Sequence, residues 1–128
     1  MARSGQIDFE TVCELGRALE GVEAGTAYGS PALKLRGKLL ACIPTHRSAE
    51  PNSVAVRLDF VTRDLLIAKD PATYYVKPHY VPYPCVLVRL DRISRTDLKE
   101  ILEIAWRYGT RQSRNRPARR GKPDSKRR

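Results

Sequence analysis

Three short segments of the chain, residues 32–36, 54–59 and 86–91, alternate apolar and polar side chains. A period of two places successive side chains on opposite faces of a β-strand, so each segment predicts a strand with one buried and one solvated face. Residues 38–43 follow the first segment directly across Gly37, which predicts the return strand of a hairpin. Residues 73–76 form a shorter strand candidate, and together these strands predict an antiparallel sheet.

Apolar residues at helical spacing lie on both sides of the strand segments. Asp8 is a suitable N-cap for a helix over residues 9–20, and residues 62–69 predict a short second helix. A third helix is expected after Ser94 and should end at Gly109, with its apolar stripe formed by Leu98, Ile101, Leu102, Ala105 and Trp106. Three prolines make residues 77–84 a loop. The order predicts an α+β fold, a two-layer sandwich with helices packed on one face of the sheet.

The net charge of +10 is concentrated at the C-terminal end. Residues 111–128 contain nine Lys or Arg and one Asp, which leaves a net charge of only +2 for residues 1–110. The same C-terminal segment contains Ala118 as its one residue from the hydrophobic set, so it cannot offset the entropy lost on ordering. We therefore expect one folded domain, residues 1–110, and a disordered basic tail, residues 111–128.

Several classes of protein are disfavoured by composition. No window approaches the roughly 18 apolar residues of a membrane span, and the N-terminus lacks a signal-peptide core, so we expect a cytoplasmic protein that does not bind membranes. Cys13, Cys42 and Cys85 are odd in number and well separated, which favours reduced, buried thiols. His46 and His79 lie in separate predicted loops, so neither a metal site nor a cofactor is expected. A monomer is the expected state.

Four segments resemble the MmcQ/YjbR family of small bacterial proteins. They are residues 28–39, with Tyr-Gly-Ser-Pro at their start, residues 70–75, residues 79–90, which begin His-Tyr, and the closing helix 97–106. The family often has Phe at the position of Leu33 and Trp near Cys85, and both departures are apolar exchanges. The resemblance implies a CyaY-like (frataxin-like) fold and a working assignment as a DNA-binding protein, and it implies no catalytic residues.

The first candidate site is a basic surface for nucleic acid. Alternation directs several cations away from the helices, where they can neutralise phosphates, and the tail supplies further positive charge. The candidate residues are Lys34, Arg36, Lys38, Arg57 and Arg89 on the sheet, and Arg111, Arg114, Arg116, Arg119 and Arg120 in the tail. The alternative is an ordinary solvated sheet face, in which Asp59 and Asp91 balance the positive charge.

The second candidate site is a pocket near the proline-rich loop. Aromatic side chains there can stack on exposed bases or line a small cavity. The candidate residues are Tyr28, Tyr75, His79, Tyr80 and Tyr83. The alternative is a rigid loop with half-buried tyrosines whose hydroxyls are hydrogen-bonded within the protein.

These features lead to three hypotheses for function. The first is a nucleic-acid-binding accessory protein that contacts DNA through phosphates with low sequence specificity. The second is a binding module for a small molecule or protein partner at the aromatic pocket. An enzyme centred on His79 is the weakest hypothesis, because a general base needs an orienting partner and a substrate that the sequence does not identify. We therefore expect a binding protein and not an enzyme.

Overall fold

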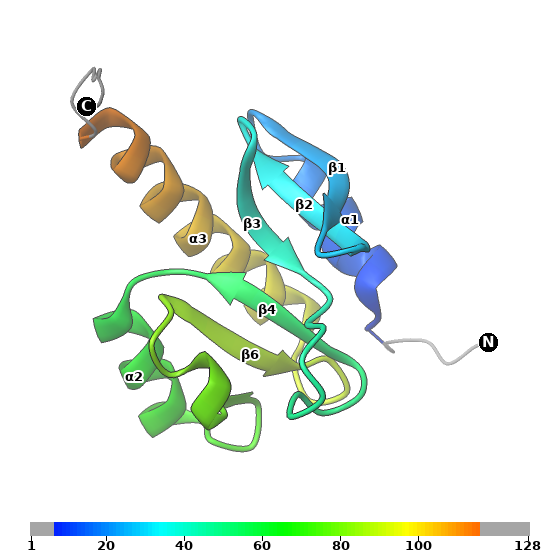
Figure 1. Ribbon diagram of the computed structural model, residues 1–128, viewed down its shortest axis with the longest axis vertical. Coiled ribbons are helices and arrows are strands. Elements are labelled where there is room, and N and C mark those ends of the chain that lie inside the picture. The colour runs from blue at the N-terminus through cyan, green and yellow to red at the C-terminus, as the bar shows by residue number, and fades with distance from the viewer. Residues whose placement is uncertain (1–6, 116–128) are drawn as a thin grey trace.

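The computed structural model describes residues 7–115, which form three α-helices, one 3-10 helix and six strands (Figure 1). In chain order the elements are α1 (Phe9–Arg17), β1 (Val22–Ala27), β2 (Ser30–Leu35), β3 (Lys38–Cys42), β4 (Ser53–Arg57), α2 (Phe60–Lys69), β5 (Tyr74–Tyr75), η1 (Pro78–Tyr80), β6 (Cys85–Arg89) and α3 (Arg95–Asn115). The predicted α+β class is confirmed, whereas the CyaY-like topology stays a prediction.

All six strands belong to one antiparallel sheet with the order β1-β2-β3-β4-β6-β5. Two-residue turns join β1 to β2 and β2 to β3. The pairing between β3 and β4 is short, because only Ala41 with Val56 and Cys42 with Ala55 are partners. Beyond these pairs the two strands diverge, and α3 is visible between them (Figure 1).

One face of the sheet carries the large apolar side chains and is covered by α1 and α3 (Figure 1). Val54, Val56, Val86 and Val88 point from the central strands into this layer and are fully buried. They meet the predicted stripe of α3, of which Leu98, Ile101, Leu102 and Ala105 are buried. The predicted two-layer packing is therefore confirmed, and burial of this apolar area is its main driving force.

Side chains cap the start of each α-helix. Asp8 accepts from the Thr11 amide at 3.1 Å, and Asp59 accepts from the Thr62 amide at 3.2 Å. Ser94 accepts from the Asp97 amide at 3.0 Å. Each bond satisfies an amide that has no partner inside its own helix.

The predicted end of the third helix at Gly109 is wrong. α3 continues through Asn115. Gly109 allows α3 to pack closely against Leu35, because a Cβ at this position would lie 2.8 Å from Leu35 Cδ2. The proposed domain limit at residue 110 therefore falls inside α3, and residues 111–115 of the expected tail are helical. Residues 116–128 of that tail lie outside the described residues.

Other element bounds differ from the prediction by a few residues. α1 ends at Arg17 and not at residue 20, and the strand β1 precedes the first predicted strand. Arg36, expected in a strand, lies instead in the β2–β3 turn with a φ of 49°. Within residues 7–115, none of the helices has the length and hydropathy that a membrane crossing needs.

Candidate functional site

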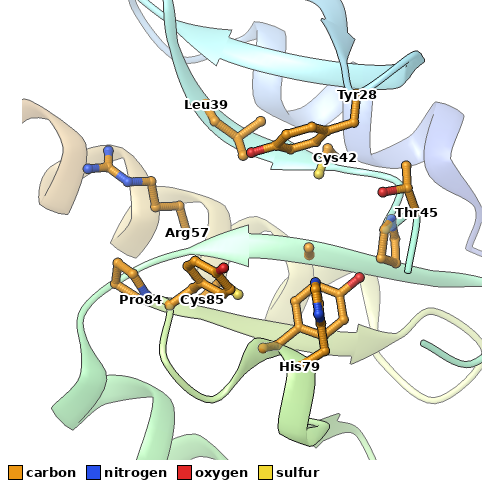
Figure 2. Close-up of a pocket in the computed structure, with 12 residues that line it drawn as sticks. Tyr28, Leu39, Cys42, Thr45, Arg57, His79, Pro84 and Cys85 are labelled. Atoms are coloured by element: carbon orange, nitrogen blue, oxygen red, sulfur yellow. The ribbon is translucent and has the colours of Figure 1, made fainter. Parts of the chain in front are cut away.

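A cavity of about 420 Å³ lies on the sheet face opposite α1 and α3 (Figure 2). Its floor is formed by side chains of three neighbouring strands, Leu39 and Cys42 of β3, Ala55 and Arg57 of β4, and Cys85 of β6. Ala55 occupies the centre of β4, between Val54 and Val56, which point to the opposite face. A small side chain at this position leaves space that a Val or Ile would fill, so the floor is hollow. We call this space the tyrosine cavity.

Tyr28 forms one wall of the tyrosine cavity from the turn between β1 and β2 (Figure 2). Tyr28 and Gly29 have φ angles of 55° and 79°, as in a type I′ hairpin turn. The side chain of Tyr28 is 84% exposed and therefore contributes little to the core.

The opposite wall comes from the segment between β5 and β6, where His79, Tyr80, Tyr83 and Pro84 line the cavity. The rings of His79 and Tyr80 make an edge contact, with centroids 4.9 Å apart. Tyr83 remains 53% exposed at the rim.

Arg63 of α2 holds this wall in place. Its guanidinium is buried and donates to the carbonyl oxygens of Val81, at 2.9 Å, and Tyr83, at 3.3 Å. The Leu58 amide also donates to the carbonyl oxygen of Pro84 at 3.0 Å, directly before β6 begins. The prolines of the segment limit its flexibility further, so this wall is formed before any ligand binds.

His46 and His79 come from separate loops but stack face to face, with ring centroids 3.7 Å apart and an interplanar angle of 9°. The Ser48 amide donates to His46 Nδ1 at 3.1 Å, so this nitrogen is an acceptor and carries no proton. Partial desolvation, and then the charges of His79 and Arg47, lower the pKa of His46. The stacked pair therefore favours a neutral His46 ring behind the cavity wall.

Two tyrosine hydroxyls fix the loop between β3 and β4. Tyr80 Oη accepts from the His46 amide at 3.2 Å, and Tyr75 Oη accepts from the Glu50 amide at 2.9 Å. Tyr75 also shares a hydrogen bond of 2.7 Å with the buried Ser53 hydroxyl. This loop carries Pro44 and Thr45, which complete the cavity lining.

The structure brings four of the five predicted pocket residues together, because Tyr28, His79, Tyr80 and Tyr83 all line the cavity. Tyr75 is buried beside it, in the cluster of Ala32, Cys42, Ala55 and Leu87. Its ring also lies under the Arg89 guanidinium, at 4.2 Å.

Two of the predicted nucleic-acid residues of the sheet, Arg89 and Arg57, contact other side chains of the protein. Arg89 makes a paired contact with both Glu50 carboxylate oxygens at 2.7 Å, and it donates to the carbonyl oxygens of Pro71 and Ala72. The hydrogen bond from Arg89 lowers the pKa of Glu50. Arg57 stacks on Tyr108, with Cζ 5.2 Å from the ring centroid.

The remaining predicted cations lie on β2, at the β2–β3 turn, on α3 and beyond residue 115. Lys34 is half-buried in β2, while Arg36 and Lys38 are exposed at the β2–β3 turn. Arg111 is exposed and Arg114 is also part of α3. Arg116, Arg119 and Arg120 lie outside the described residues.

The thiols in the cavity floor are poor nucleophiles. Burial raises the pKa of Cys42, and it raises the pKa of Cys85 to about 11 even though Arg63 acts in the opposite direction. Both side chains are therefore neutral thiols near pH 7, and they add polarizable, apolar surface. Among residues 7–115, no three His, Cys, Asp or Glu side chains are grouped so that they could hold a metal ion.

Sequence reasoning did not identify the cavity floor or the histidine stack. A signal for the floor was present, because alternation places Ala55 on the same face as Arg57, where a strand normally carries larger residues. The stack carried no such signal, since 32 residues of chain separate His46 from His79 and only the folded loops bring them together.

Comparisons with known proteins identify a family. The family model YjbR matches residues 17–108, which include every strand, all of α2 and most of α3, whereas α1 lies outside the match except for Arg17. Two relatives from Mycobacterium tuberculosis and one from Mycobacterium bovis are each 42% identical over 66 residues, and all three carry the name uncharacterized protein. The match covers 48% of this chain and 51% of each relative, so the chain spans about half the length of these relatives. No solved structure matches significantly.

Proposed function

The chain belongs to the YjbR family, and we propose that it is a binding module for a small, flat aromatic molecule held in the tyrosine cavity. One observation carries this proposal. Aromatic side chains from two segments far apart in sequence, Tyr28 on one side and His79, Tyr80 and Tyr83 on the other, enclose a floor of small and apolar side chains.

The size and chemistry of the cavity fit a small ligand. Its volume of about 420 Å³ lies within the range of roughly 300–1,000 Å³ that ligand pockets occupy. Rings of Tyr and His offer faces and edges on which a planar molecule can stack, while Leu39 and Ala55 contact its apolar parts. The walls are fixed by Arg63 and by the tyrosine hydroxyls, which reduces the entropy cost of binding.

In this proposal the cavity binds its ligand and does not catalyse a reaction. A nucleophile or general base in the cavity would need activation, yet the two thiols in the floor have raised pKa values. His46 Nδ1 is already occupied by the Ser48 amide and hydroxyl. These contacts support a structural role for the groups that enzymes commonly use in catalysis.

Nucleic-acid binding is the second candidate, and the geometry supports it less. Arg89 has protein partners for its guanidinium, so the sheet face offers fewer cations to phosphates than the sequence predicted. The exposed turn of Arg36 and Lys38 and the cations of the C-terminal segment support this function instead.

The experiment that tests the main proposal is a fluorescence titration with N-phenyl-1-naphthylamine, an uncharged aromatic probe whose emission rises in apolar sites. Ala55→Leu should fill the cavity floor and weaken binding at least about tenfold, since the three added carbon atoms occupy space that the ligand would use. Ala24→Leu is the matched control, because Ala24 is exposed on the edge strand β1. Equal affinity of the wild type and Ala55→Leu would contradict the proposal, provided that both variants fold.

A further inference from the structure

The tyrosine cavity has an uneven charge distribution. Arg57 is the one Lys or Arg among its lining residues, and none of them is an Asp or Glu. Nearby carboxylates are already paired, since Glu50 contacts Arg89 and Lys77 while Asp64 contacts Arg63. The cavity therefore carries positive charge at one end without a carboxylate in its lining to balance it.

Arg57 lies where β3 and β4 diverge. It is the last residue of β4 and pairs with Cys85 of β6, and its side chain extends from the floor toward α3 (Figure 2). There the guanidinium lies over the ring of Tyr108, with Cζ 5.2 Å from the ring centroid. No carboxylate within residues 7–115 forms an ion pair with Arg57.

The contact with Tyr108 prepares the guanidinium for a ligand. Stacking uses the flat face of the group and leaves the N–H donors around its edge, in the fork geometry that matches an anion. The continuation of α3 beyond Gly109 adds the exposed Arg111, whose charge acts on Asp59. Asp59 also accepts from the Thr62 amide, so the acid nearest in sequence to Arg57 is engaged as the cap of α2.

We propose that the ligand of the tyrosine cavity is an aromatic acid, whose ring lies between Tyr28 and the His79 wall and whose negative group is bound by Arg57. This inference rests on the proposed binding function and adds the charge of the ligand to it. The apolar floor between Arg57 and Thr45 holds the ring, so the two ends of the cavity define the orientation of the bound molecule (Figure 2).

Two probes with the same aromatic skeleton test the inference on the full chain. 1-Anilinonaphthalene-8-sulfonate carries a sulfonate, and N-phenyl-1-naphthylamine lacks it. In Arg57→Gln we expect the sulfonate probe to bind about tenfold more weakly, because a charge-assisted contact is lost, whereas the uncharged probe should change less than about twofold. Lys34→Gln is the matched control, since Lys34 lies on β2 and does not line the cavity.

The outcomes separate this inference from the proposed function. Selective loss of the sulfonate probe in Arg57→Gln, with Lys34→Gln unchanged, supports an anionic ligand. An equal change for both probes, or no change for either, overturns the role of Arg57 while binding at the cavity stands. If neither probe binds the wild type, or if Ala55→Leu affects neither, both the inference and the proposed function are wrong.

Discussion

At the scale of single residues, Tyr28 has an environment that the stability of the fold does not explain. A large aromatic side chain occupies a left-handed backbone position in a turn where Asn or Gly is usual. It is also largely exposed, so it gains little from burial. Residues in unfavourable conformations are often kept for function, and here the ring lines the cavity.

Replacement of Tyr28 by Asn should therefore separate stability from binding. We expect Tyr28→Asn to keep the free energy of unfolding or raise it by up to about 1 kcal/mol, because Asn tolerates the left-handed region. The same variant should weaken binding of N-phenyl-1-naphthylamine about fivefold, through loss of one stacking wall. Chemical denaturation and fluorescence titration measure the two effects.

Arg36→Asn is the control for this variant. Arg36 occupies the corresponding position of the β2–β3 turn, with a φ of 49°, and it does not line the cavity. It should show the same effect on stability and none on binding. If Tyr28→Asn binds the probe as tightly as the wild type, Tyr28 is not a wall of the binding site.

His46 provides a prediction on pH. Its pKa should lie below the ordinary value of about 6.5, first because of desolvation and then because of the neighbouring charges of His79 and Arg47. When the pH falls below about 6.5, His46 is protonated in the unfolded chain before it is protonated in the folded one. The free energy of unfolding therefore decreases as the pH falls from about 6.5 toward the lower pKa of the folded state. An NMR titration should show the lowered pKa in the wild type and a higher value in His79→Gln. A His46 pKa at or above 6.5 in the wild type would contradict the stacked, neutral arrangement.

At the scale of elements, the periodicity of the sequence predicted the buried strands and helices, but it did not predict where each element ends. Alternation identified the central strands because their inward Val side chains determine the register of the buried face. The end of α3 was not predicted correctly, because glycine commonly follows the last residue of a helix. In the structure, Gly109 lies inside α3, where the lack of a side chain allows the close approach of Leu35. Such a contact joins residues far apart in sequence, and local patterns cannot reveal it.

Gly109 should therefore be sensitive to size. Gly109→Leu should lower the free energy of unfolding by about 1–3 kcal/mol, because the new side chain overpacks the interface between α3 and β2. Arg107→Leu places the same residue on the exposed side of α3 and should stay within about 0.5 kcal/mol of the wild type. Thermal or urea unfolding measures both variants. Equal stability of the two would show that Gly109 is not required for helix packing.

At the scale of the whole molecule, the aromatic cavity and the basic C-terminal segment come from different parts of the sequence. The cavity depends on side chains between residues 28 and 85, while residues 116–128 contain seven Lys or Arg and one Asp. Individual cavity residues were predictable from their aromatic clustering in the sequence. The space itself was not, since it results from a small residue in β4 and from two loops that meet only in the fold.

The second candidate function, non-specific DNA binding, predicts that the affinity depends on the C-terminal segment. A chain of residues 1–115 keeps all of α3 and should lose most of the affinity and most of the salt dependence, because each cation on a phosphate releases counterions. Tyr28→Asn in the full chain should bind DNA normally. Titrations of a short duplex at several salt concentrations measure both effects. Unchanged affinity of residues 1–115 would instead place the DNA contacts on the folded body.

The most direct test of the central claim is amide chemical-shift mapping by NMR with indole, a neutral, flat and water-soluble aromatic. We expect the largest shifts at Leu39, Ala55 and Tyr80, and we expect them to disappear in Ala55→Leu. Val61 and Leu65 serve as an internal comparison, because they are exposed apolar residues of α2 outside the cavity. Shifts confined to α2, or no shifts at millimolar indole, would contradict the assignment of the tyrosine cavity as the binding site.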